Sequence, residues 1–278
     1  MSGRLGSSVG RIRRLEPIRA SRLSWIYLRL AVMNEVQYRV NFFIQLFQSL
    51  LALGTGLVVL ALVFSHTTAL NGWSRSELLA VMGVFTIMGG VIHSAIQPNM
   101  MRLLEDVRMG TLDYALTKPE DAQVLVSVRD FRIWQSVDVA IGLIILVVAL
   151  VQLQAGLGFW GALGFLVALV LGGFMIYCFW LLLTTAAFWV VRMDEVVELF
   201  EGVYQAGRWP VGVYPGWLRI GLTFLVPIAF AVTAPAEGLT SRLSVRTLVF
   251  EAVFALFLFC ITRWFWKRGL RRYSGASA

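Results

Sequence analysis

Long apolar runs constrain the fold of this chain more than any other feature. Each run reaches or exceeds about 18 residues, the length that marks a candidate membrane-spanning helix. A transmembrane β-barrel would show alternating apolar and polar positions instead. The sequence therefore predicts an all-α integral membrane protein of six transmembrane helices, the sixth lying somewhere in 193–236. The five clear runs lie near 40–64, 78–97, 134–152, 159–191 and 245–266.

Basic residues orient these spans, because cytoplasmic loops of membrane proteins carry an excess of Lys and Arg. Eight arginines lie within 1–39, five basic residues lie in 98–133, and five follow residue 262. The connection 65–77 carries only Arg75. We therefore expect a multi-pass protein of the cell (plasma or inner) membrane with both termini cytoplasmic. The same placement accounts for the net charge of +8, so no nucleic-acid partner is inferred.

The segment before the first span has an amphipathic pattern. Pro17 suits the first position of a helix, and Leu23, Ile26 and Leu30 recur on one face. This predicts a helix over 17–36 in the cytoplasmic interface of the membrane, the alternative being a plain cytosolic helix. The chain then divides into an Arg-rich cytoplasmic tail with an interfacial helix (1–39), a transmembrane domain (40–266) and a cytoplasmic tail (267–278).

The region that holds the sixth span allows two drawings. Hydropathy and charge favour a span at Trp217–Ala236, which leaves 192–216 in the cytoplasm. The other drawing places a polar span from near Asp194 to near Val213, followed by a re-entrant hairpin over 214–240 on the outer side. Three prolines interrupt that second segment, at positions 215, 227 and 235. Such irregular backbone is tolerated at membrane depth only against protein or a water-filled cavity.

A polar island separates the second and third spans. Of the chain's 24 basic and 16 acidic residues, 11 fall within 98–133. Asn99–Met109 can form a short helix that Gly110 terminates. Two interpretations stay open: a surface that contacts a partner, or a solvated loop with ordinary side-chain pairs. The charged residues of this helix are Arg102, Glu105, Asp106 and Arg108.

Polar residues also occur within the spans. Amide and small side chains share one face of the first span, and they either line a substrate path or bond to other helices. Carboxylates within a membrane are functional candidates, and Asp138 and Glu251 each lie about one turn inside a span. The candidate path residues are Asn41, Gln45, Gln48, Ala52, Thr55 and Glu251.

Sequence signatures of an ATPase or a hydrolase are missing. No G-x-x-x-x-G-K-[ST] phosphate-binding loop occurs. His66 and His93 are the only histidines, so an H-E-x-x-H zinc site is excluded. We therefore expect no enzyme activity, no metal site and no cofactor in this chain.

Two motifs and the order of the spans resemble the permease subunits of ABC type-2 exporters, specifically a compact six-span branch. Gly110-Thr111-Leu112, Leu116 and Lys118-Pro119 are similar to the branch's G-[ST]-L-x-x-x-L-x-[KR]-P segment. Residues 208–219 and 223–227 resemble its second motif. The resemblance covers about residues 17–270.

This resemblance implies properties that composition does not show. The permease would work with separate ABC ATPase subunits, which bind ATP and Mg, and with a second copy of itself or a sister permease in the bilayer. A cytoplasmic coupling helix between spans two and three would dock on the ATPase, and Gly110, Lys118 and Pro119 would belong to that segment. The resemblance also favours the hairpin drawing and export of an amphiphilic drug, lipid or natural product. The rival interpretation is an ion-driven secondary transporter, which would show inverted repeats and carboxylates at the membrane midplane.

Overall fold

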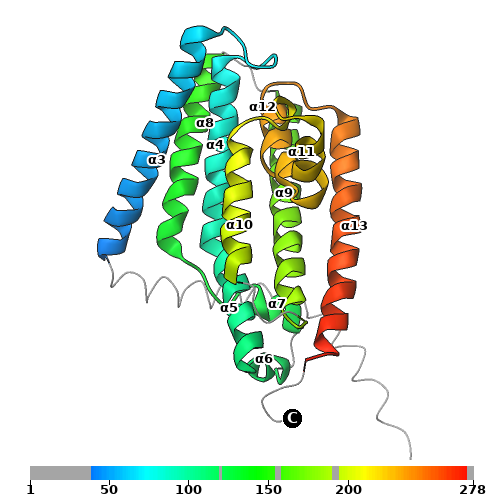
Figure 1. Cartoon of the computed structure of the whole chain (residues 1–278). Coiled ribbons are helices and arrows are strands. Elements are labelled where there is room, and N and C mark those ends of the chain that lie inside the picture. The colour runs from blue at the N-terminus through cyan, green and yellow to red at the C-terminus, as the bar shows by residue number, and fades with distance from the viewer. Residues whose placement is uncertain (1–38, 119–120, 154–157, 190–193, 274–278) are drawn as a thin grey trace, which may run out of the picture.

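A computed structural model describes residues 39–118, 121–153, 158–189 and 194–273 (Figure 1). In these ranges the chain is helical, with no strand longer than an isolated bridge. Five helical segments are long and apolar enough to cross a membrane, which confirms an all-α integral membrane protein. The helix predicted over 17–36 lies outside the described residues. The five segments are α3 (Arg39–His66), α4 (Arg75–Val91) continued by η1 (Ile92–Ile96) and α5 (Gln97–Met109), η2 (Ile133–Ser136) with α8 (Val137–Leu153), α9 (Phe159–Ala186) and α13 (Val245–Leu270).

The helix predicted over Asn99–Met109 is present as α5 and ends at Gly110 as expected, but no break separates it from the second span. Instead α4, η1 and α5 form one run of 35 residues. Proline at position 98 has no N–H to give to the carbonyl of Ser94, four residues earlier. The N–H of Arg132 bonds to that carbonyl at 2.9 Å. The helix therefore passes through the proline because a neighbouring segment supplies the missing donor.

Prolines also explain the three π-helical segments in the described chain. η1, η5 (Gly221–Leu225) and η6 (Ala229–Thr233) each end two residues before a proline, at 98, 227 and 235. A proline ring clashes with the carbonyl four residues earlier in a regular α-helix. A wider π turn is one way for a helix to absorb such a disruption.

Glycines set the contact between α4 and α8. A Cβ atom added to Gly142 would lie 2.7 Å from the backbone nitrogen of Ile87 and 2.8 Å from the carbonyl oxygen of Gly83. One added to Gly90 would lie 2.8 Å from the nitrogen of Val139. Small residues let helix backbones approach closely in membranes, so these two helices form the tightest pair described.

The region of the sixth span is bent, as a re-entrant hairpin or a broken span would be. Figure 1 shows α10 (Asp194–Tyr204) running from the end of the bundle near α5 toward the end near α12. The two halves of the following segment, Gly216–Leu225 and Ala229–Leu239, meet at 81°. A straight span over Trp217–Ala236 is therefore wrong. Val226 is extended before Pro227, which breaks the helix there.

The bent segment packs on α9 through small residues. A Cβ added to Gly172 would lie 2.5 Å from the carbonyl oxygen of Phe230, and Ala168 is fully buried. The connection after the segment is fixed by Arg242, whose guanidinium bonds to Glu77 at 2.7 Å and lies 4.7 Å from the centre of the Trp73 ring. Two short helical turns, η3 (Gln205–Arg208) and η4 (Val211–Val213), lead from α10 into the bent segment. The bent segment itself consists of α11 (Gly216–Ile220), η5, η6 and α12 (Ala234–Leu239).

Two short helices close the opposite end of the bundle, α6 (Asp113–Leu116) and α7 (Ala122–Val126). Asp121 caps α7, since its carboxylate accepts the backbone N–H of Gln123 at 2.9 Å. The guanidinium of Arg263 on α13 pairs with the same carboxylate and donates to the Gln123 side chain at 2.6 Å. This pairing lowers the pKa of Asp121 below its ordinary value and joins α7 to α13.

Candidate functional site

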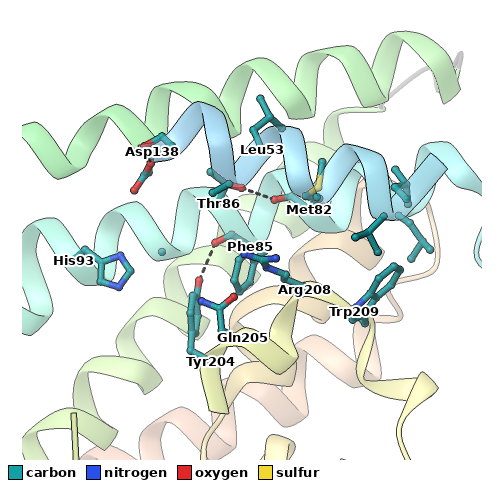
Figure 2. A pocket seen from close by; sticks show the side chains of 17 residues that line it. Leu53, Met82, Phe85, Thr86, His93, Asp138, Tyr204, Gln205, Arg208 and Trp209 are labelled. Carbon is teal, nitrogen blue, oxygen red and sulfur yellow. Dashed lines mark hydrogen bonds between the residues drawn. The ribbon is translucent and has the colours of Figure 1, made fainter. Parts of the chain in front are cut away.

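A cavity of about 220 Å³ lies where α3, α4, α8 and α10 meet, with η3 closing one side (Figure 2). A second, more open hollow of about 380 Å³ adjoins it. The two share Ser49, Ala52, His93 and Asp138, so we treat them as one site with an inner and an outer part. The inner part is further lined by Leu53, Gly56, Val59, Leu60, Leu78, Met82, Phe85, Thr86, Gly89, Tyr204, Gln205, Arg208 and Trp209.

Apolar and aromatic side chains form most of the inner wall. The Phe85 and Tyr204 rings stack with centroids 4.7 Å apart. The buried Tyr204 hydroxyl donates to the carbonyl of Phe85 at 2.8 Å. A Cβ at Gly56 would lie 2.9 Å from the sulfur of Met82, so the glycine leaves room for that side chain. Aromatic and apolar walls of this kind hold the carbon skeleton of a small molecule.

The carboxylate of Asp138 marks the polar end of the site. It accepts hydrogen bonds from the Ser49 hydroxyl and, at 3.2 Å, from the Gln45 amide. Both donors come from α3, so a polar contact fixes α3 against α8. No basic side chain among the described residues pairs with this carboxylate.

The outer part carries further polar groups. His93 in η1 bonds to Glu201 on α10, with 3.0 Å between Nε2 and Oε1. Arg132 is exposed at this side. The remaining outer residues are Gln45, Gln48, Gln97 and Gln135.

The structure brings some of the predicted path residues together and separates others. Gln45 and Gln48 line the outer part of the site. Asn41 and Thr55 are exposed on α3 and do not line it, and the Thr55 hydroxyl donates to the carbonyl of Ala52 at 2.9 Å. Their role in a path stays a prediction.

Glu251 lies elsewhere, on α13. It is fully buried, and its two carboxylate oxygens have no hydrogen-bond partner among the described residues. Its neighbour one turn along, Ala255, packs with Met175 and Phe230 between α13, α9 and η6. Glu251 therefore belongs to a separate part of the molecule, and its predicted place in a path with Gln45 and Gln48 stays untested.

Several residues of the site escaped sequence reasoning. Ser49 lies four residues after Gln45, a spacing that places both on one helix face. Its position beside Gln45 could therefore have been predicted from the sequence. No local pattern marked Glu201 as a partner of His93. The parts played by Tyr204 and Arg208 depend on where η3 folds back, and no local pattern signals that.

The polar island forms a compact end structure rather than a solvated loop. Asn99 is fully buried, and its amide makes four hydrogen bonds. Its Nδ2 donates to the carbonyls of Ala95 and Asp130 at 2.7 and 2.6 Å. Its Oδ1 accepts the N–H groups of Arg129 and Asp130 at 2.8 and 2.9 Å. A single side chain thus fastens the segment after α7 to the second span.

The predicted contact residues of the island differ in exposure. Arg102, Glu105 and Arg108 are exposed on α5. Asp106 is half-buried, and its carboxylate accepts a hydrogen bond from the guanidinium of Arg129 at 2.6 Å. Gly110 ends α5 with φ 71°, a left-handed conformation that glycine adopts without strain. Lys118 is exposed, and Pro119 lies outside the described residues.

Comparison with known proteins gives one match. The family model described as ABC-2 family transporter protein matches residues 50–277, which is most of the chain. The matched region contains the island and most of the cavity, whose residues Gln45, Gln48 and Ser49 precede it. No curated protein and no solved structure matches the chain significantly.

Proposed function

The chain belongs to the ABC-2 family of transporters, and from this premise we propose that it is the membrane permease of an ATP-driven exporter. The observation that carries the proposal is the family match over 50–277, a region that includes most of a cavity between the spans. Hydrolysis takes place in a separate ATPase chain, which binds ATP and Mg. A second copy of the chain, or a sister permease, completes the path in the bilayer.

The cavity suits an amphiphilic substrate. Its inner wall offers Phe85, Met82 and Leu53, and its outer part offers carboxylate, amide and imidazole groups. A molecule with an apolar body and a polar head would meet a matching surface in each part. Export of a drug, lipid or natural product of that type is the activity that the geometry supports best.

Coupling to an ATPase is supported by the continuity of the second span. The exposed side chains of Arg102 and Glu105 stand on α5, and the same helical run continues into α4, which lines the cavity. A force applied at α5 therefore reaches the cavity wall through one helix rather than through a loop. The η1 segment between them holds His93, where the wider turn permits local rearrangement.

The test uses the full chain co-expressed with a candidate ABC ATPase from a neighbouring reading frame. Membranes with the permease alone should hydrolyse no ATP above background, and the pair should co-purify in detergent. The double variant Arg102→Glu/Glu105→Arg should reduce co-purification about tenfold or more, because it reverses exposed charges that meet the partner. Replacing the whole of 99–118 is unsuitable, since Asn99, Leu103 and Leu112 are core residues.

Arg246→Glu provides the matched control. Arg246 is exposed on α13 at the other end of the bundle, so its reversal should leave co-purification unchanged. Undiminished co-purification of the α5 variant would overturn the coupling assignment. ATP-independent transport driven by an ion gradient would overturn the exporter proposal itself.

A further inference from the structure

Charge is distributed unevenly along the cavity. Asp138 lies beside Gly90 of α4, because a Cβ added to Gly90 would lie 3.1 Å from the Cβ of Asp138. The guanidinium of Arg208 lies 5.7 Å from the centre of the Phe85 ring. These levels are five residues apart on α4, which is about 7.5 Å along a helix. Figure 2 shows Phe85 and Thr86 in the space between Asp138 and Arg208.

The carboxylate at one end lacks a cationic partner among the described residues. Asp138 is met only by the neutral Ser49 hydroxyl and Gln45 amide. A carboxylate within a membrane is costly unless a cation or water meets it. Of the other charged groups at the site, Glu201 is bonded to His93, and Arg132 lies exposed at the outer edge. The charge that Asp138 presents to the cavity is therefore one that a cationic group of a ligand would neutralise.

The other end fixes the direction of such a ligand. The guanidinium of Arg208, which lies over the Phe85 ring, repels a cation at that end of the cavity. An anionic head in the outer part would face two carboxylates, Asp138 and Glu201. Both ends thus favour one orientation, with the positive head at Asp138.

We propose that the cavity binds amphiphilic organic cations, with the ammonium head against Asp138 and an aromatic or alkyl body between Leu53, Met82 and Phe85. The inference rests on the proposed function in one respect: a bound cation is a substrate only if the chain is an exporter. Binding itself requires no ATPase, so the two can be tested separately.

The experiment compares three naphthalene probes by equilibrium dialysis against the full chain in lipid nanodiscs, with empty nanodiscs subtracted. The cation is (2-naphthylmethyl)trimethylammonium, its neutral isostere carries a tert-butyl group in place of trimethylammonium, and the anion is 2-naphthylmethanesulfonate. The cation should bind about tenfold or more tightly than the isostere, as expected for a charge-assisted contact. The anion should bind most weakly. Equal binding of cation and isostere would overturn the proposal, and this comparison needs no variant.

Substitutions locate the contact. Asp138→Asn removes the charge and keeps one acceptor oxygen, enough for the Ser49 hydroxyl, whereas the Gln45 amide loses the second oxygen to which it donates. The variant should abolish the preference for the cation and still bind the neutral isostere. Asp113→Asn, the same change in α6 outside the cavity, should preserve the preference. Arg208→Gln should tighten cation binding severalfold. A preference for the cation that survives Asp138→Asn would place the cation elsewhere and refute the assignment.

The outcomes separate the two proposals. If the unaltered chain shows no preference for the cation but supports ATP-driven transport, only the proposed ligand class is refuted. An Asp138-dependent cation preference in a chain that pairs with no ATPase would refute only the exporter proposal.

Discussion

Asn99 shows how much of the structure one buried amide can hold. Both of its donors and both acceptor positions on its oxygen are used, and three of the four groups it meets are backbone atoms of the segment after α7. Removing one partner of a buried hydrogen bond leaves the other unsatisfied at a cost of about 1–3 kcal/mol. The segment after α7 has no regular secondary structure at Arg129 and Asp130, so it relies on this residue.

We therefore expect Asn99→Ala to reduce the free energy of unfolding by about 2–4 kcal/mol, since the N–H groups of Arg129 and Asp130 lose their acceptor. The measurement is thermal unfolding of the purified protein in detergent, followed by tryptophan fluorescence. Asn41→Ala is the matched control, because Asn41 is an exposed amide on α3. Equal unfolding temperatures for the two variants would show that other contacts hold the segment.

The Asp121–Arg263 pair gives a pH-dependent prediction. The folded protein lowers the pKa of Asp121, so the pair's stabilisation is present at neutral pH and is lost as the pH falls through that lowered pKa. Arg263→Gln should lower stability at pH 7 by less than about 1 kcal/mol, because both side chains are partly exposed. The difference from wild type should shrink between about pH 5 and about pH 3. Thermal unfolding across this range checks the sign, and a difference that grows on acidification would contradict it.

Glycine and proline residues determine how the helices of this molecule pack and where they bend. Long apolar runs were enough to predict five spans, because continuous hydrophobicity reports directly on burial in lipid. The length of the second span was not predictable in the same way. Pro98 reads locally as a helix boundary, and only the distant N–H of Arg132 allows the helix to continue. The bend at Pro227 fits the hairpin drawing, which the family resemblance favoured over a straight span.

The glycine contact between α4 and α8 can be tested directly. Gly142→Ala should disrupt the pair and reduce the yield of folded protein severalfold, because its Cβ would lie 2.6 Å from a side-chain carbon of Ile87 as well as too near the backbone. Gly54→Ala is the control, since nothing lies within 4 Å of a Cβ there. Size-exclusion chromatography of both variants in detergent measures the folded fraction. A monodisperse Gly142→Ala protein at wild-type yield would mean that the two helices can move apart without loss.

At the scale of the whole molecule, the prediction at issue is how the chain crosses the membrane. Single cysteines in a background without Cys178 and Cys260 report the side of the membrane by labelling of intact cells with an impermeant thiol reagent. Thr68→Cys, in the connection after α3, should label from outside, and Thr117→Cys should label only after permeabilisation. Gly216→Cys should behave like Thr68→Cys, because the hairpin lies at that end.

The control for this test is built into the three positions. All are exposed in the structure, and a Cβ at Gly216 meets nothing within 4 Å. Labelling of Gly216→Cys only after permeabilisation would overturn the outer placement of the hairpin and make 216–239 a broken span that crosses the membrane. Inverted labelling of all three would reverse the orientation inferred from the arginines.

Sequence reasoning reached the site only in part, and the reason is physical. Gln45, Gln48 and Asp138 stood out because polar groups in an apolar span are rare and costly. Tyr204 and Arg208 gave no such signal, because aromatic and basic residues are ordinary at the ends of spans. Their place at the cavity depends on how α10 and η3 cross the bundle, which is tertiary information. Glu251 gave the same signal as Asp138 yet lies among different helices.

The unequal packing of α3 and α4 gives the molecule a mechanical asymmetry. In the most apolar window of α3 only 11% of residues are buried, against 61% in that of α4. One wall of the cavity therefore belongs to the closely packed pair α4 and α8, which meet at Gly142. The facing wall is α3, which packs on fewer residues and is held to Asp138 by Ser49 and Gln45. A molecule entering between them acts as a wedge, and its most direct way to widen the cavity is to swing α3 away from that pair.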